Sequence, residues 1–598
     1  MKDDRVRREY QAVIAELYEE ARAGGCASGK DVELAWKELK EGIVGAATKV
    51  CGTMRGRSGQ VKRTRWWNEE VKSAVQKKKV LYKRLLDTGN VEARQRYNEA
   101  KLEARKLVRK AKNDEWVQFG KELEKDAKGN QPRFWARVNG NRMTKESMTR
   151  INGKNGQVLS EGAEVIGRWK EHFEELFHEV GEPLSDTQCS EAMQEDDMGI
   201  MKEEVRNGVK RLKMRKAPGI CGILPEMLKA GGEVVIEWMA DVFNLVWRVG
   251  VAPGDWKNAV VVPVHKKGSR LECANYRGIS LMSIVGKVFA RVLNERVKMA
   301  TVDKVMDEQG GFRTGRGCND QIFAVKQIVE KTIEKDKKTY MAFVDLEKAY
   351  DNVSREKLWK VLYAYGVKGR LLRAIQALYV DGRAKVKVGE MESELFEVHR
   401  GVRQGCTLSP WLFNVFIDSV TREARRQFLR EVKLSTGDVG LLLFADDMVV
   451  MAESVEGLQH NLQVMSDVLS RWELRVNWRK TKVMRIARKR EECEVKIDEE
   501  VIEQVDAMKY LGVMISSDGR MEKEVEARIG GATRVIGGLN DVVLRRKELS
   551  RSTKLKVVNA TVMPTLLYGC ETWTLSKQQQ LKVQATQMKV LRRIEGVT

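Results

Sequence analysis

Two unbroken apolar runs enclose a pair of adjacent aspartates, and this stretch most constrains how the chain can fold. Residues 440–454 read GLLLFADDMVVMAES, in which the apolar runs 441–444 and 448–451 flank Asp446 and Asp447. Short apolar runs bounded by a turn are typical of buried β-strands. The pattern therefore predicts a β-hairpin with both aspartates at its tip.

Two interpretations of the paired carboxylates are open. The aspartates can face water in an exposed turn, which is a common arrangement. Alternatively, they hold a divalent cation, whose charge compensates the cost of placing two carboxylates side by side.

A third aspartate favours the cation site. Asp345 ends another apolar strand, predicted over 340–345, within the stretch FVDLEKAYD. If the two strands are neighbours in one sheet, three carboxylates meet at its end, and oxygen ligands of this kind suit Mg²⁺. Two such ions, about 3.5–4 Å apart, would assist phosphoryl transfer. Glu347 and Asp351 lie beyond the strand and are predicted to be structural.

Charge and composition narrow the class of partner. The chain has 598 residues, enough for three or four domains, and 108 Lys+Arg against 85 Asp+Glu give a net charge of +23. A nucleic acid is the expected polyanionic partner, and a basic protein without such a partner is the alternative. The nine cysteines show no CxxC spacing. Since neither a secretory signal nor a membrane span is recognised, we expect the nucleus and/or cytoplasm and no membrane partner.

Residues 61–120 are strongly basic, contain several aromatic residues and have no proline. One or two long helices are predicted there. They are either an arm that grips RNA or a solvated helical hairpin, and the sequence leaves both open.

The remaining pattern mixes strands and helices. It predicts an α+β core with helices packed on one side of a sheet. Ser409 and Pro410 are expected to open a helix, with serine at the N-cap. The other predicted elements are a turn with flanking strands at 151–158, helices around 169–177 and 235–246, a strand at 259–265, and a hairpin joining 385–389 to 394–399.

Eight ordered blocks resemble the reverse transcriptase of non-LTR retrotransposons, of the LINE type and similar to jockey. The catalytic ones are FVDLEKAYD, GVRQGCTLSP and FADD. The others are WKNAVVVPVHKKG, NYRGISL, EQGGFRTGRGCNDQI, NWRKTKVM and YLGVMIS. The resemblance covers residues from about 60 to 598. It implies an RNA-directed DNA polymerase that adds dNTPs to a DNA primer 3′-OH on an RNA template.

The resemblance also implies a right-hand polymerase with fingers, palm and thumb. The expected ranges are a basic, mainly helical N-terminal extension or linker (1–150), an extension of the polymerase with the fingers (151–340), the palm (341–515) and a helical thumb, possibly truncated (516–598).

By resemblance, Asp345, Asp446 and Asp447 are the catalytic, metal-binding residues of the palm. They would hold two Mg²⁺ ions, with Mn²⁺ as a possible substitute. Tyr350 stands where the family more often has phenylalanine, and it would select dNTPs over rNTPs by excluding a 2′-hydroxyl.

Other blocks supply the implied nucleotide and primer contacts. Gln404 and Gly405 line the nucleotide pocket, where glycine lets the backbone approach the base pair. Lys480 would protonate the leaving pyrophosphate, although Lys482 lies two residues away. The remaining contacts are Lys266, Lys267 and especially Arg277 to the triphosphate, Arg403 to the template, and Tyr510, Leu511 and Gly512 to the primer end.

The chain departs from the family pattern in two ways. Cys221 replaces the usual aspartate of PGxDG, which would loosen a turn or mark a decaying element copy. Neither the family's upstream endonuclease nor its Cys/His knuckle is recognised, so target nicking is not expected. The alternative function is a catalytically inactive RNA-binding remnant or domesticated fragment. An intron-type maturase and an RNA-dependent RNA polymerase are disfavoured by NYRGISL and EQGGFRTGRG.

Overall fold

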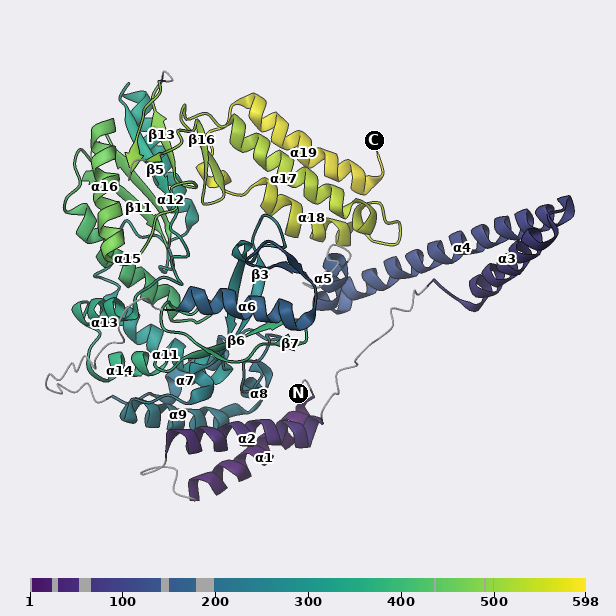
Figure 1. The fold of residues 1–598 in the computed structure, drawn as a ribbon, viewed down its shortest axis with the longest axis horizontal. Coiled ribbons are helices and arrows are strands. Elements are labelled where there is room, and N and C mark those ends of the chain that lie inside the picture. The colour runs from purple at the N-terminus through teal and green to yellow at the C-terminus, as the bar shows by residue number, and fades with distance from the viewer. Residues whose placement is uncertain are drawn as a thin grey trace. The chain divides into compact units, whose positions relative to one another are not determined.

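The computed structural model, drawn in Figure 1, forms two compact units. The first comprises residues 1–53 and 147–520, and the second comprises 54–146 and 521–598. The predicted N-terminal range 1–150 is therefore shared between the units, whereas the boundaries expected within the polymerase stay predictions. The structure describes residues 3–23, 31–52, 66–140, 150–178, 198–434, 437–488, 491–497 and 500–597.

The first unit contains most of the strands and helices. Its helices are α1 (Asp4–Ala23), α2 (Val32–Cys51), α6 (Gly162–Phe177), α7 (Lys202–Lys210), α8 (Pro225–Ala230), α9 (Gly232–Val249), α10 (Gly254–Lys257), α11 (Ile284–Thr301), α12 (Cys318–Glu334), α13 (Arg355–Ala364), α14 (Gly369–Ala377), α15 (Ser409–Arg425) and α16 (Val455–Arg471), with a 3₁₀ turn at Cys273–Asn275. Its strands are β1 (Ile151–Asn152), β2 (Val158–Leu159), β3 (Ala259–His265), β4 (Tyr276–Leu281), β5 (Thr339–Val344), β6 (Arg383–Val388), β7 (Met391–Glu392), β8 (Phe396–Glu397), β9 (Val432–Leu434), β10 (Gly437–Val439), β11 (Leu441–Phe444), β12 (Asp447–Ala452), β13 (Lys482–Ile486), β14 (Lys496–Ile497), β15 (Glu500–Val501), β16 (Ala507–Tyr510) and β17 (Val513–Ser516).

An antiparallel sheet in the order β11–β12–β5–β13 forms the centre of this unit. On one face, Ala342 and Val450 pack in the same core as residues of α15 and α16. On the other face, Met341 and Val449 pack with residues of α12. The α+β class is thus confirmed, but the prediction that helices cover only one side of the sheet was wrong. Burial of both faces explains why these strands read as unbroken apolar runs instead of alternating ones.

The predicted aspartate hairpin is present. Strands β11 and β12 pair with Phe444 opposite Asp447, so Ala445 and Asp446 alone form the turn. Ala445 has a φ of 58°, a left-handed conformation that costs a residue with a Cβ roughly 1–2 kcal/mol. The surrounding structure must therefore hold this turn in place.

A second sheet, in the order β4–β3–β6–β7 with β8 also paired to β6, packs against α6. The predicted strand 259–265 coincides with β3. The hairpin expected across 385–399 is tighter than predicted, because β7 pairs with β6 within the stretch expected to be the turn. The predicted serine N-cap was also displaced by one residue. Leu408 is the N-cap of α15, and the Ser409 hydroxyl lies 3.2 Å from the Tyr379 hydroxyl instead.

The loop that contains Cys221 is closed by a hydrogen bond from the Gly222 N–H to the Gly219 carbonyl, at 3.2 Å. Cys221 is buried, and its Sγ lies 3.3 Å from Oγ of Ser283, the N-cap residue of α11. The thiol thus packs against the start of α11, and a loosening of the turn by cysteine stays a prediction.

The second unit is helical. It consists of α3 (Glu69–Thr88), α4 (Val91–Gly129), α5 (Gln131–Gly140), α17 (Glu522–Leu539), a π-helical turn (Asn540–Leu544), α18 (Arg551–Leu566), a 3₁₀ turn (Cys570–Thr572) and α19 (Lys577–Glu595). Leu123 near the end of α4 and Phe134 of α5 share a core with α17, α18 and α19. The long helices predicted in 61–120 are confirmed as α3 and α4. In neither unit does a described helix have the length and apolar composition needed to cross a membrane.

Candidate active site

The register of the central sheet brings the three aspartates to one end. Met448 of β12 pairs with Val344 of β5, so the next step of the same antiparallel register sets Asp447 opposite Asp345. Residues opposite each other on antiparallel strands carry their side chains on the same face. Asp446 lies in the adjoining turn. Asp345 is about 100 residues away from Asp446 and Asp447 in the sequence. The three carboxylates are therefore neighbours only in the fold.

Like charges and a cationic rim act on these carboxylates. Desolvation by the surrounding protein, together with the charges of Asp446 and Asp345, raises the pKa of Asp447 to about 6. Lys266 and Arg277 oppose this rise. In turn, burial and repulsion from Arg277 and Lys480 lower the pKa of Lys266. Acidic and basic groups from five separate sequence blocks thus interact at one place.

Lys480 forms an ion pair with the first aspartate. Its Nζ lies 3.0 Å from Oδ2 of Asp345, and the Asn477 N–H donates to the Asp345 carbonyl at 2.7 Å. Lys482, the alternative in the same motif, instead pairs with Glu503 at 2.8 Å. Lys480 lies in the turn that precedes β13, whereas Lys482 is the first residue of that strand, and of the two only Lys480 has its ammonium beside an aspartate of this site.

A cleft of about 1420 Å³ opens over this end of the sheet. Its lining includes most of the residues singled out from the sequence: Lys266, Arg277, Asp345, Tyr350, Arg403, Gln404, Gly405, Asp446 and Lys480. Lys267 is exposed and, among the described residues, does not belong to this lining.

Tyr350 lies flat against an aromatic ring of α15. Its ring centroid is 4.4 Å from that of Phe413, with an angle of 15° between the planes. The phenol oxygen is buried and has no hydrogen-bond partner among the described residues. Burial, with a contribution from Asp446, raises the pKa of the phenol. The ring is thus held rigidly beside the carboxylates by packing.

Gln404 is held by an aspartate that the sequence marked only as structural. Its Nε2 donates to both carboxylate oxygens of Asp351, at 2.9 and 3.0 Å. Asp351 is buried, which raises its pKa to about 6. Gly405 has a φ of 116°, and a Cβ there would lie 2.8 Å from the Ser280 carbonyl oxygen. Glycine is therefore required at position 405 because the backbone passes close to β4. An approach of this glycine to a base pair stays a prediction.

Two predicted nucleic-acid contacts have partners within the protein. The Arg403 guanidinium donates to the Trp256 carbonyl at 2.9 Å and lies over the Tyr379 ring at 5.1 Å. Tyr510 is buried, with its ring 5.6 Å from that of Phe343. Leu511 and Gly512 form the tight turn between β16 and β17. A template contact by Arg403 and primer contacts by residues 510–512 stay predictions.

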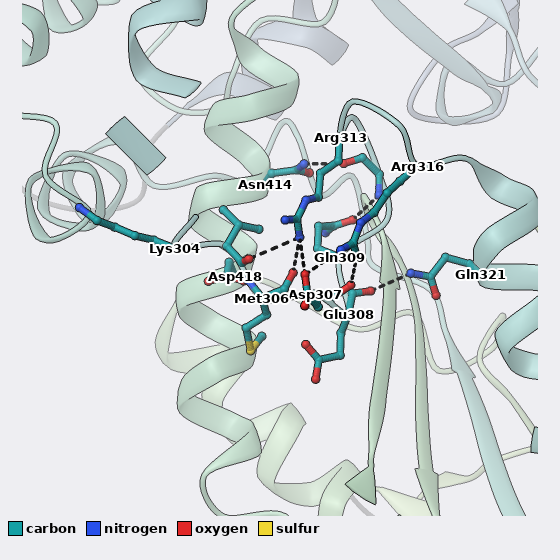
Figure 2. Close-up of polar contacts among 12 residues, drawn as sticks. Lys304, Met306, Asp307, Glu308, Gln309, Arg313, Arg316, Gln321, Asn414 and Asp418 are labelled. Atoms are coloured by element: carbon teal, nitrogen blue, oxygen red, sulfur yellow. Dashed lines mark hydrogen bonds and ion pairs between the residues drawn. The ribbon is translucent and has the colours of Figure 1, made fainter. Parts of the chain in front are cut away.

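Gln309 supports the aspartate turn and was not singled out from the sequence. Its side chain is fully buried, and its Oε1 accepts hydrogen bonds from the N–H groups of Ala445, at 2.9 Å, and Gly311, at 2.8 Å. Asn414 of α15 donates to the Gly311 carbonyl at 2.6 Å. Figure 2 shows Gln309 and Asn414 in this region, together with Gln321, which donates to the Glu308 carbonyl. Gln309 lies in the block EQGGFRTGRG, which resembles the family pattern. No local sequence pattern indicates, however, that its buried amide supports a turn far away in the sequence.

The carboxylate oxygens have the chemistry of ligands for a hard divalent cation. The raised pKa of Asp447 reports a concentration of negative charge that such a cation would relieve. As the side chains stand, no three His, Cys, Asp or Glu residues of the described ranges are gathered closely enough to hold a metal ion. Asp345 is turned toward Lys480 instead.

Comparison with known proteins identifies the family that this site resembles. Residues 264–515 match the family model described as "Reverse transcriptase (RNA-dependent DNA polymerase)". The chain is 26% identical over 410 residues to the RNA-directed DNA polymerase from mobile element jockey of Drosophila melanogaster, a match that covers 66% of this chain and 44% of that protein. The resemblance to non-LTR retrotransposon reverse transcriptases is thereby confirmed.

The chain is also similar to a second transposon protein and to a solved structure, and the two matches differ in identity and coverage. The probable RNA-directed DNA polymerase from transposon X-element of Drosophila melanogaster is 28% identical over 408 residues, again 66% of this chain and 44% of that protein. Apo telomerase from Candida tropicalis has a TM-score of 0.35 at 13% identity, covering 66% of this chain and 80% of that one. The chain spans less than half the length of the jockey and X-element proteins.

Proposed function

We propose that this chain, whose residues 264–515 match the reverse transcriptase family, is an RNA-directed DNA polymerase. It would extend a DNA primer on an RNA template by transferring dNTPs to the primer 3′-OH. The observation that carries the proposal is the meeting of Asp345, Asp446 and Asp447 with Lys266 and Arg277 beside one cleft. Anionic groups beside cationic ones are what transfer of a nucleotide from a triphosphate requires.

The three aspartates would hold Mg²⁺, or Mn²⁺ in its place. When bound, two such ions supply charge stabilisation for the attacking and leaving oxygens of an in-line displacement. Asp345 would hold the cation through its carboxylate, of which Oδ2 pairs with Lys480. Lys480, which this ion pair keeps beside the site, is the residue we propose as the proton donor to pyrophosphate.

The rest of the cleft would bind and select the nucleotide. Lys266 and Arg277 attract the triphosphate, while the rigid ring of Tyr350 excludes a 2′-hydroxyl. Gln404, oriented by Asp351, lines the nucleotide pocket. In this proposal the palm (341–515) contains β11–β13 and all of β5 except its first two residues, residues 151–340 supply the N-terminal extension of the polymerase and the fingers, and 516–598 form the thumb.

Primer extension on a poly(rA) template with an oligo(dT) primer tests the proposal. We expect Asp446→Asn to lower the extension rate at least about a hundredfold while RNA binding is retained, since loss of one charge-stabilising group costs that much in other enzymes. Rigorous chelation of divalent ions should likewise stop extension, and added Mg²⁺ should restore it.

Equal extension by the variant and the parent would contradict the catalytic assignment. Folded parent protein that binds RNA but never extends a primer would instead favour the inactive alternative.

A further inference from the structure

The helices α3 and α4 form a basic antiparallel hairpin, which we call the α3–α4 arm (residues 69–129). Gly89 and Asn90 join the helices, and the Asn90 side chain caps α4 by accepting from the Ala93 N–H at 2.8 Å. Figure 1 shows the two helices side by side. The buried residues between positions 69 and 112 are Val71 and Ala74 of α3 and Ala93, Ala100 and Ala104 of α4. Such a thin seam leaves most of the circumference of each helix exposed.

The exposed surface of the arm has an unbalanced charge. From position 72 to position 112 the sequence contains 14 Lys and Arg but 4 Asp and Glu. Within the described part of the arm, ion pairs join Lys72 to Glu69, Lys77 to Glu103 and Lys128 to Glu124. A hairpin that needed charge only for solubility would carry both signs interspersed. The excess of one sign instead creates a field that attracts polyanions.

Five of these cations lie along one face of α4. Arg94, Lys101, Arg105, Arg109 and Lys112 follow each other at intervals of seven, four, four and three residues. These intervals match the helical repeat and give a stripe about 27 Å long. The alanines of the seam occupy a different face, since Ala100 and Ala104 are buried whereas Arg94 and Arg105 are exposed. The stripe is therefore available to a partner without opening the hairpin.

Aromatic rings lie among the cations. The Lys112 Nζ lies over the Trp66 ring at 4.7 Å, and the Tyr82 and Tyr97 rings are 5.1 Å apart. Tyr82 and Trp67 are 46% and 44% exposed. Exposed rings beside a basic track are the combination that binds nucleic-acid backbones and stacks on unpaired bases.

From these observations we propose that the α3–α4 arm binds the phosphate backbone of a nucleic acid through the stripe Arg94, Lys101, Arg105, Arg109 and Lys112. This site is separate from the cleft that would bind the dNTP and primer end. The arm would hold RNA or DNA without reading its sequence, because the stripe offers charge along a line and no fixed constellation of base-reading groups.

Equilibrium binding by the full chain tests the proposal. The stripe variant replaces all five residues by glutamine, which removes charge but retains high helix propensity. A matched control removes five exposed charges from another helical pair: Arg5, Arg8, Arg22, Lys37 and Lys49, of α1 and α2, become glutamine. A third variant replaces each lysine of the stripe by arginine and each arginine by lysine, which keeps the charge of all five positions. Fluorescence anisotropy with single-stranded RNA, duplex RNA and duplex DNA would be followed from about 0.05 to about 0.2 M salt.

We expect the stripe variant to bind at least about tenfold more weakly. The slope of log affinity against log salt should become shallower by about 3.5 to 4.5, because each of the five phosphate contacts contributes about 0.7–0.9. The matched control and the lysine–arginine exchange should stay close to the parent. Comparison of the affinities for the three probes shows whether the arm prefers the phosphates of RNA or those of DNA.

Equal losses in the stripe variant and the matched control would overturn the proposal, as would an unchanged salt slope. An arm that binds an acidic protein instead would leave all nucleic-acid affinities unchanged, which also overturns it. Circular dichroism verifies that the helices persist. Because binding is measured without catalysis, a parent chain that binds but does not extend a primer would defeat the proposed function and leave this inference standing.

Discussion

The side-chain oxygen of Gln309 accepts a hydrogen bond from the backbone N–H of Ala445, at 2.9 Å. Gln309 and Ala445 are both buried, and Ala445 has the left-handed φ that places Asp446 and Asp447 at the tip of the hairpin. Gly311 lies so close that a Cβ on it would be 2.4 Å from the same backbone nitrogen. The geometry of the carboxylates thus depends on a residue more than 130 positions away.

We expect Gln309→Ala to lower both stability and primer extension. Losing the acceptor leaves two buried N–H groups without a partner, which costs roughly 1–3 kcal/mol each. Chemical denaturation gives the stability, and the extension rate should be compared at a temperature where the variant remains folded.

Gln321→Ala is the matched control for this change. Gln321 is also a buried glutamine of the same block, but its amide donates to the Glu308 carbonyl and not to the turn. We expect a comparable loss of stability with extension largely retained. If both variants lost extension equally, Gln309 would have no specific role in positioning the aspartates.

Lys480 and Lys482 should respond differently to removal of charge. Lys480 pairs with Asp345 at the cleft, whereas Lys482 pairs with Glu503. Lys480→Gln should slow the chemical step about a hundredfold, as expected for loss of a general acid, and Lys482→Gln should have little effect. Single-turnover kinetics measure that step, and the reverse order of effects would reject the assignment.

Tyr350 should control the choice between dNTP and rNTP through the bulk of its ring. Tyr350→Phe retains the stack on Phe413 and removes a hydroxyl that has no partner among the described residues, so selectivity and stability should stay near the parent. Tyr350→Ala should raise rNTP incorporation relative to dNTP by about tenfold or more, since steric exclusion of one group contributes about 1–3 kcal/mol. Competition between dTTP and UTP on one primer measures this ratio, and unchanged selectivity in the alanine variant would contradict a steric role.

At limiting Mg²⁺, primer extension should fall as the pH drops through about 6, because protons then compete with the cation for Asp447, whose pKa in the metal-free chain is raised from 3.8 to about 6. A raised pKa means that the folded chain holds this proton more tightly than the unfolded chain. The stabilisation from protonation is therefore fully present below pH 3.8 and is lost as the pH rises through about 6.

Asp447→Asn should consequently gain stability at neutral pH while losing extension. Asp351 also titrates near 6, so Asp351→Asn serves to separate its contribution to the pH profile. A parent profile that stays flat between pH 5 and 7 would show that neither carboxylate controls the rate.

The elements with a strong periodic pattern agree closely with the structure. The apolar runs around Asp446 and before Asp345 predicted three strands, and all three form because burial on two faces requires no polar alternation. The basic helices of 61–120 also form as expected. The sequence did not predict that the strands before Asp345 and after Asp446 pair with each other; the metal site was predicted on the assumption that they do. Strand pairing joins segments about 100 residues apart, and no local signal specifies it.

The sequence by itself determined which side chains carry charge, which runs must be buried and which blocks resemble a reverse transcriptase, because these depend on residue type and spacing. Only the tertiary structure decided that Lys480 and not Lys482 meets Asp345, that Asp351 orients Gln404, and that Gln309 holds the turn at Ala445. Each of these depends on the direction of one side chain toward a distant segment, and packing and hydrogen bonding fix that direction only once the chain has folded.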